Sequence, residues 1–148
     1  MKMKHNIIPT ILIADDDADD RMMIKEALEE NNFSHDMRFV EDGEELLDYL
    51  HQRGKYLTEK VQRPNLIILD LNMPKIDGRE ALSQIKSNTH LKRIPVIVLT
   101  TSRAEEDILR TYDLGVNSFI CKPVRYNDLV IVTREIGNYW FNTVALPN

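Results

Sequence analysis

Two short, fully apolar runs in the middle of the chain constrain its fold more than any other feature. The segments NLIILD, residues 65–70, and PVIVLT, residues 95–100, are apolar at every position between their ends. Strands that bury both faces are typical of the centre of a parallel sheet with helices packed on each side. These runs therefore predict an α/β fold.

The rest of the chain alternates between segments with the sequence pattern of a strand and segments with the pattern of a helix. Further strands are predicted at residues 11–14, 37–39 and 118–121. Apolar residues recur at helical spacing in residues 23–28, 46–50, 81–85 and 129–140. Ser102 and Glu105 have the spacing of a capping box for another helix that should end near Gly115. Together the patterns predict about five β-α units.

Length and charge limit what this chain can be. Its 148 residues suit a single domain, with a core at about residues 10–137, a short extension at 138–148 and no output domain. The net charge of −5 argues against a nucleic-acid binder. No stretch is long and apolar enough to cross a membrane, and the lone Cys121 fits a reducing compartment, so we expect a cytoplasmic protein.

In residues 53–63, apolar residues do not recur at the spacing of a buried helix or strand. This segment therefore predicts a loop or a poorly packed extension.

Polar residues stand at the carboxyl end of four predicted strands. Ligands of open parallel sheets bind at that edge, where distant segments of the chain meet. Three carboxylates there repel one another unless a cation joins them, and Mg²⁺, or Mn²⁺ in its place, suits oxygen ligands of this kind. A lysine and a threonine complete a site for a small anion such as a phosphoryl group. The residues are Asp15, Asp16, Asp70, Thr100 and Lys122.

Asp70 is the residue that we expect to react. An aspartate can accept a phosphoryl group as an aspartyl-phosphate, and Asp70 ends the central strand between the acid pair and the Thr100/Lys122 side. A bound cation would offset the charge on the attacking carboxylate and on the transferred group.

The acid-rich run DDDADD at residues 15–20 has two other readings. As a calcium-binding EF-hand loop it would use Asp15, Asp17, Asp19 and Glu26, but Asp20 stands where that loop needs glycine. The second reading is a solvated helix start, where acids favour the positive end of the helix dipole. We expect this second reading to hold for Asp17, Asp19 and Asp20, and the metal reading for Asp15 and Asp16.

Four motifs in order resemble the receiver domain of two-component response regulators. They are DD at residues 15–16, LDLNMPKIDG at 69–78, VIVLTTS at 96–102 and FICKP at 119–123, and the likeness runs from about Thr10 to Ile136. The resemblance implies a flavodoxin-like, doubly wound sheet of five parallel strands in the order 2-1-3-4-5, with helices on both faces.

The resemblance also implies a role for each site residue. Asp16, Asp70 and the backbone carbonyl of Asn72 would bind Mg²⁺, and Asp15 would act through water or from outside the direct ligands. Lys122 would contact the phosphoryl group on Asp70. Thr100 and Phe119 would form the conformational switch, and Asn72 and Ser102 would tune water attack on the aspartyl-phosphate. The family often has a cis bond at the position of Lys122–Pro123.

A narrower similarity links residues 53–63 and the ending IGNYWFNTVALPN to small stand-alone regulators that work with phytochrome histidine kinases. The predicted function is therefore a stand-alone response regulator, not an enzyme in its own right, that assists its own phosphotransfer and slow autodephosphorylation. Its partners would be a sensor histidine kinase and a downstream protein, a phosphotransfer partner or a second copy of itself. The alternatives are a Mg²⁺-dependent phosphohydrolase and a pseudo-receiver that only binds a partner. The role of Tyr139 and Trp140, as core or as contact patch, stays open.

Overall fold

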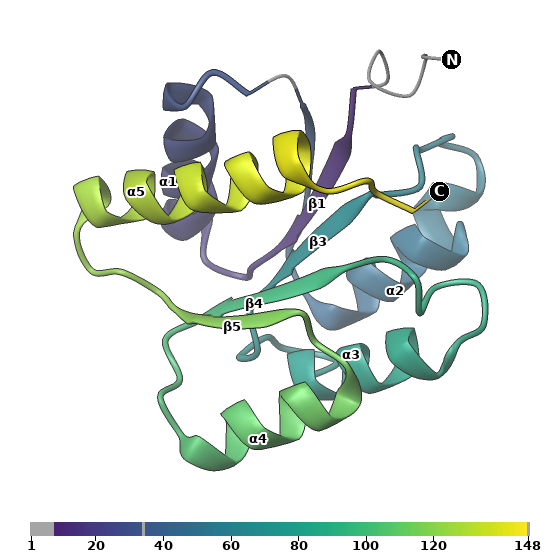
Figure 1. The fold of residues 1–148 in the computed structure, drawn as a ribbon. Helices are drawn as coiled ribbons and strands as arrows, with labels where there is room; N and C mark the ends of the chain where they lie inside the picture. The colour runs from purple at the N-terminus through teal and green to yellow at the C-terminus, as the bar shows by residue number, and fades with distance from the viewer. Residues whose placement is uncertain (1–7, 34, 148) are drawn as a thin grey trace.

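The structure of the protein is a computed structural model that describes residues 8–33 and 35–147 (Figure 1). Strands and helices alternate along these residues, as the sequence predicts. The strands are β1 (Thr10–Ala14), β2 (Asp36–Val40), β3 (Leu66–Leu69), β4 (Val96–Thr100) and β5 (Ser118–Cys121). The α-helices are α1 (Ala18–Glu30), α2 (Gly43–His51), α3 (Gly78–Ser87), α4 (Glu105–Leu114) and α5 (Tyr126–Gly137). A short 3-10 helix, η2 (Gly54–Leu57), and a π-helical turn, η3 (Asn138–Thr143), complete the list.

All five strands form one parallel sheet in the order β2-β1-β3-β4-β5, which confirms the predicted topology. The register aligns the carboxyl ends of neighbouring strands: Ala14 pairs with both Val40 and Leu69, and Thr100 pairs with Cys121. The residues that follow these ends therefore emerge at one edge of the sheet.

Helices cover both faces of the sheet, with α1 and α5 on one side and α2, α3 and α4 on the other (Figure 1). The strand residues alternate between the two layers. Ile11 and Ile13 pack with the α1/α5 layer, while Leu12 and Ala14 pack with the other. These four side chains are essentially inaccessible to solvent, and burying each large one is worth about 1.5–3 kcal/mol. This core fixes the positions of the strands, and therefore of the polar residues that follow their carboxyl ends.

Aspartates begin three of the helices, but α4 starts differently from the prediction. Asp17, Asp42 and Asp77 accept backbone N–H bonds at the starts of α1, α2 and α3. Helix α4 has Ala104 at its N-cap and no side-chain cap, so the capping box of Ser102 and Glu105 is wrong. The Ser102 hydroxyl donates instead to Asp107, at 2.7 Å. The predicted end is confirmed, because Gly115 caps α4 with φ 106°.

The segment after α2 is better packed than its sequence suggests. Tyr56, in η2, is 7% exposed and meets the ring of Tyr49 edge to face, with centroids 5.1 Å apart. Its hydroxyl donates to Glu45 Oε2 at 2.7 Å. The prediction of a loop without packing is therefore wrong for η2, where one aromatic side chain anchors the segment to α2.

The last predicted helix has a change of geometry near its end. Helix α5 stops at Gly137, and Tyr139, Trp140 and Phe141 lie in the π-helical turn η3. A Cβ at Gly137 would lie 2.1 Å from the ring of Phe33, so this glycine permits the close approach of that ring. In the described residues, no helix has the length and hydropathy that a membrane span requires.

Candidate functional site

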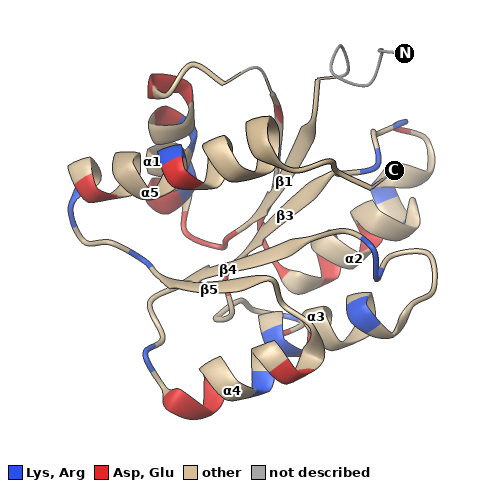
Figure 2. Cartoon of the chain, viewed as in Figure 1, with Lys and Arg blue, Asp and Glu red and all other residues tan. Residues whose placement is uncertain are grey.

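The site lies at the carboxyl edge of the sheet, where backbone hydrogen bonds continue past the strand ends. The Asp70 N–H donates to the carbonyl of Ala14 at 3.0 Å, and the Lys122 N–H donates to the carbonyl of Thr100 at 2.7 Å. Acidic residues occupy the loop between β1 and α1, and basic residues occupy the loop between β5 and α5 (Figure 2). The strand register therefore fixes the backbone from which the site side chains project.

Gly78 lets helix α3 approach the strand end that carries Asp70. A Cβ on this residue would lie 2.3 Å from the carbonyl oxygen of Asp70 and 2.6 Å from Cα of Leu71. The Gly78 N–H also donates to the carbonyl of Leu71 at 2.9 Å. Any larger residue would push the loop after β3 away from α3, so the glycine is part of what positions Asp70.

Lys122 stands among three carboxylates. Its Nζ lies 2.7 Å from Asp15 Oδ2, 2.7 Å from Asp20 Oδ2 and 3.3 Å from Asp70 Oδ2. The lysine side chain is 10% exposed, and Asp15 is 1% exposed. One buried ammonium group thus balances only part of the negative charge that surrounds it.

Asp70 has a partner on each carboxylate oxygen. Its Oδ1 accepts a hydrogen bond from Thr100 Oγ1 at 2.7 Å and a longer one from the Asn72 N–H at 3.4 Å. Its Oδ2 accepts from Lys122. Asp70 is 6% exposed and Thr100 is fully buried, so the hydroxyl and the ammonium group hold this carboxylate in a fixed orientation.

Burial and charge change the proton affinities of two groups in the site. Desolvation raises the pKa of Asp15, although contact with Lys122 acts in the opposite direction. For Lys122, burial alone would lower the pKa, but Asp15, Asp20 and Asp70 together raise it above its ordinary value. The lysine is therefore firmly protonated and remains the positive charge of the site.

Three carboxylates at this edge match what a divalent cation requires. One oxygen each from Asp15, Asp16 and Asp70 lies within 4.8 Å of the others. Asp15 Oδ2 is buried and its neighbour is Lys122 Nζ, at 2.7 Å, so this atom adds negative charge beside the oxygens of Asp16 and Asp70. A set of carboxylate oxygens with this excess of negative charge suits a hard cation like Mg²⁺. The EF-hand reading is wrong, because a strand precedes the acids and Asp17 Oδ1 is engaged in capping α1.

The remaining predicted residues surround this centre. Phe119 is half-buried against the core on the β5 side, and Asn72 and Ser102 adjoin Asp70 and Thr100 through their backbone N–H groups. Their roles as switch and tuning residues stay predictions. The Lys122–Pro123 bond, at a position that is often cis in the family, is trans here, as is every peptide bond within residues 8–33 and 35–147.

Sequence reasoning missed two charged residues near the site. Asp20 begins α1 as expected, but its carboxylate also reaches Lys122. Asp20 lies in the first turn of α1, and no local pattern indicates that its side chain contacts Lys122, 102 positions away. Arg79, in the first turn of α3, pairs with Asp107 of α4 through two hydrogen bonds of 2.6 Å. No local pattern joins residues 28 positions apart.

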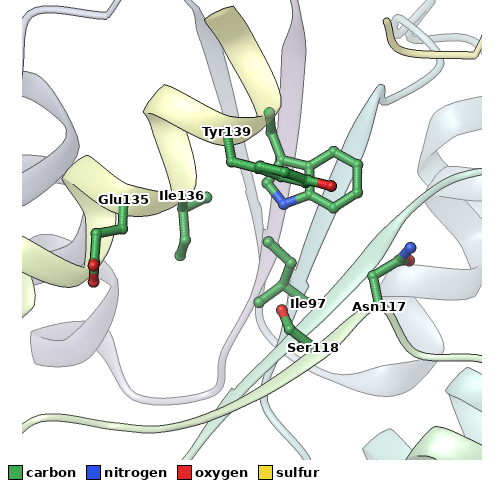
Figure 3. A pocket seen from close by; sticks show the side chains of 7 residues that line it. Ile97, Asn117, Ser118, Glu135, Ile136 and Tyr139 are labelled. Atoms are coloured by element: carbon green, nitrogen blue, oxygen red, sulfur yellow. The ribbon is translucent and has the colours of Figure 1, made fainter. Parts of the chain in front are cut away.

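A hollow of about 320 Å³ lies at the opposite, amino edge of the sheet, between β4, β5 and the end of α5 (Figure 3). Trp140 packs partly against Leu66, Ile97 and Ile136, while Tyr139 is 52% exposed and meets Trp140 edge to face. Trp140 therefore packs against the core, as the first sequence reading expects, while Tyr139 faces solvent beside the hollow, and the contact-patch reading stays a prediction.

Comparison with known proteins agrees with this geometry. The family described as the response regulator receiver domain matches residues 11–134. Response regulator Rcp1 from Synechocystis sp. is 42% identical over 147 residues, which cover 99% of each chain. The crystal structure of the phosphorylated cyanobacterial phytochrome response regulator RcpA is 43% identical, with a TM-score of 0.89 over 96% of this chain and 100% of that one. The Mn²⁺-bound form of Rcp1 is 42% identical, with a TM-score of 0.87 over 95% and 99% of the two chains.

Proposed function

We propose, since this chain belongs to the response regulator receiver family, that it is a phosphorylation switch whose phosphoryl acceptor is Asp70. The observation that carries the proposal is the environment of this carboxylate. Asp70 is buried, it contacts Thr100 and Lys122, and it shares a compact cluster with Asp15 and Asp16. A carboxylate whose only task was to end a strand would not need these four partners.

The donor that we propose is a phosphohistidine of a sensor kinase. A carboxylate oxygen of Asp70 attacks the phosphorus atom, the P–N bond breaks, and its electron pair returns to the histidine ring. When bound, Mg²⁺ offsets the negative charge of the carboxylate and of the phosphoryl oxygens. Asp16, Asp70 and the Asn72 carbonyl would hold it, with Asp15 outside the direct ligands, and Mn²⁺ could substitute for it. The existence of a Mn²⁺-bound form of the similar Rcp1 supports binding of a divalent cation by this chain.

Lys122 and Thr100 are the residues that we propose respond to the modification. Both already contact the carboxylate oxygens that would carry or flank the phosphoryl group. A phosphoryl oxygen would become their new acceptor, and Thr100 would move toward it. Phe119, half-buried on the neighbouring strand, would rotate inward as Thr100 vacates space. The modification thus shifts a two-state equilibrium at the face formed by α4, β5 and α5.

A phytochrome-type histidine kinase is the kinase that we propose, because RcpA is a phytochrome response regulator of similar sequence and fold. Residues 10–137 would form the receiver core, and 138–148 a short extension. The signal would pass to a downstream protein, a phosphotransfer partner or a second copy of the chain. Assistance to its own phosphotransfer and slow dephosphorylation would be its only catalytic chemistry.

Phosphorylation with a small labelled donor tests this proposal. The protein incubated with Mg²⁺ and acetyl phosphate should gain an acid-stable, base-labile label, and Asp70→Asn should gain none. Asp77→Asn, which changes a carboxylate on the neighbouring helix cap, is the matched control and should be labelled. Equal labelling of the wild type and Asp70→Asn would show that Asp70 is not the acceptor.

The alternative functions predict different results in the same assay. A phosphohydrolase of the aspartyl-phosphate type uses a second aspartate two positions after the nucleophile, where this chain has Asn72. We therefore expect no multiple turnover of phosphomonoesters. A pseudo-receiver would neither bind Mg²⁺ nor take up beryllofluoride, whereas the intact acid cluster favours both.

A further inference from the structure

Arg79 of α3 forms a bidentate ion pair with Asp107 of α4 beside the site. Its Nε donates to Asp107 Oδ1 and its Nη2 donates to Asp107 Oδ2, both at 2.6 Å. The Asp107 side chain is 13% exposed and the Arg79 side chain 25% exposed, so water screens the pair only in part. Bidentate arginine–carboxylate pairs of this kind are both strong and geometrically specific. Figure 2 shows acidic residues at the start of α4 and basic residues on the adjacent α3.

Asp107 also accepts a hydrogen bond from the residue next to the reactive centre. The Ser102 hydroxyl donates to Asp107 Oδ2 at 2.7 Å, and the Ser102 N–H lies 3.5 Å from Thr100 Oγ1. Thr100 in turn donates to Asp70. A continuous line of polar contacts therefore runs from Asp70 to the carboxylate of Asp107, with Arg79 at its far end.

Arg79 leaves the Asp107 carboxylate little capacity to act as a base. Two guanidinium N–H groups and the Ser102 hydroxyl already occupy its oxygens. The same contacts lower the pKa of Asp107 to about 2, Arg79 being the larger cause and Ser102 the second. The remaining Arg79 nitrogen pairs with Asp77 at 3.0 Å and reaches Asn72 Oδ1 at 3.5 Å. Arg79 thus contacts the side-chain oxygens of Asp107, Asp77 and Asn72.

We propose that Arg79 is a positioning residue that lengthens the lifetime of the phosphoryl group on Asp70. It does so by pairing with Asp107, the hydrogen-bond acceptor of Ser102, which reduces the ability of this carboxylate to accept a proton. The inference rests on the proposed function, because it concerns the decay of the aspartyl-phosphate. It assigns a task to an ion pair that otherwise only joins two helices.

The chemistry concerned is hydrolysis of the acyl phosphate. A water oxygen bonds to phosphorus, the bond between phosphorus and the Asp70 oxygen breaks, and the electron pair stays with the Asp70 carboxylate. The attacking water must lose a proton. Ser102 can accept that proton while it passes its own to Asp107, provided that Asp107 is basic enough. With Arg79 in place Asp107 is a poor base, and the phosphoryl group persists.

Decay of the labelled protein tests the inference. Wild type, Arg79→Gln and the double variant Arg79→Gln/Asp107→Asn are labelled with ³²P-acetyl phosphate and Mg²⁺, freed of donor, and followed over time. Arg79→Gln should decay about tenfold faster, less than the 10²–10⁴-fold typical of a well-positioned acid-base group. The double variant should return to near the wild-type rate, because the base is gone. An unchanged rate in Arg79→Gln, or a double variant as fast as Arg79→Gln, overturns the inference.

Two controls separate this effect from charge and from unfolding. Arg93→Gln makes the same change of charge at an exposed position before β4, where Arg93 has no hydrogen bond or ion pair among the described residues, and it should decay at the wild-type rate. An equal acceleration in Arg93→Gln would overturn the inference. The rate of labelling and the affinity for Mn²⁺ should be unchanged in Arg79→Gln, and a matching loss in both would assign Arg79 a purely structural role. If the wild type takes up no label, the proposed function fails instead.

Discussion

Two clusters of charge lie on neighbouring parts of the same edge of the sheet, and they are balanced very differently. Around Lys122, one ammonium group faces Asp15, Asp20 and Asp70, with Asp16 close by. Around Asp107, one carboxylate meets one guanidinium group through two short hydrogen bonds. The first cluster carries an excess of negative charge, whereas in the second the largely buried Asp107 is paired with Arg79, whose remaining nitrogen contacts the exposed carboxylate of Asp77.

The difference indicates which cluster is built to take up further charge. Excess carboxylates that are buried together destabilise a fold unless a cation is added, so the Lys122 cluster is incomplete without one. A saturated arginine–carboxylate pair has no such requirement, and it contributes rigidity instead. The two clusters therefore predict different effects of removing a charge: a loss that Mg²⁺ partly recovers around Lys122, and a smaller loss that depends on pH around Asp107.

Loss of the lysine should have the largest effect on stability. Lys122→Met keeps the length of the side chain but leaves the buried carboxylates of Asp15 and Asp70, and the partly exposed Asp20, without their cation. We expect the free energy of unfolding to fall by about 3–5 kcal/mol. Added Mg²⁺ should recover part of this loss, because it supplies the missing positive charge. Urea denaturation with and without Mg²⁺ measures both effects.

The matched control for this variant is an exposed lysine. Lys55 forms an ion pair with Glu45 at 2.9 Å, and its side chain is 61% exposed. Lys55→Met should cost no more than about 1 kcal/mol, with no recovery by Mg²⁺. If Lys122→Met cost as little as Lys55→Met, the two lysines would be equivalent and the incomplete cluster would not exist.

Loss of the balanced pair should have a smaller effect, and one that depends on pH. Asp107→Asn should reduce the free energy of unfolding by about 2 kcal/mol at neutral pH, the range of a hydrogen bond to a charged group. Arg79, and then Ser102, lower the pKa of Asp107 from 3.8 to about 2 in the folded protein. A lowered carboxyl pKa stabilises the fold above the unfolded value and ceases to do so as the pH falls through the folded value. The difference between the wild type and Asp107→Asn should therefore disappear as the pH falls from about 4 to 2.

Acid titration of both proteins by thermal unfolding checks this window. A difference that stays constant down to pH 2 would mean that the Asp107 carboxylate is not stabilised by its neighbours. A Mg²⁺-dependent difference would contradict the separation of the two clusters.

Much of the site was predictable because the ends of the strands determine where the site residues lie. Apolar runs such as NLIILD fix where each strand ends, and the parallel order brings those ends together, so the juxtaposition of Asp15, Asp70, Thr100 and Lys122 follows from the sequence. The chemical roles of these residues do not follow from position, and they remain proposals. Asp20 was half-predicted, since its backbone starts a helix while its side chain reaches the lysine.

The parts that sequence reasoning missed depend on contacts between distant side chains. Ser102 and Glu105 have capping-box spacing, but the short bond from Ser102 to Asp107 replaces that arrangement. Tyr56 stands alone in a polar segment, and only its contacts with Glu45 and Tyr49 bury it. In both cases a tertiary partner overrides a local pattern.

Paramagnetic broadening by Mn²⁺ tests the central claim most directly, because it locates the cation in solution. In amide NMR spectra of the wild type, substoichiometric Mn²⁺ should first broaden the residues after β1 and β3, around Asp15, Asp16 and Asp70. Asp16→Asn should abolish this broadening, while Asp107→Asn should leave it intact. Broadening that survives Asp16→Asn, or that centres on the start of α4, would contradict the claim that the carboxylates around Lys122 form the metal site.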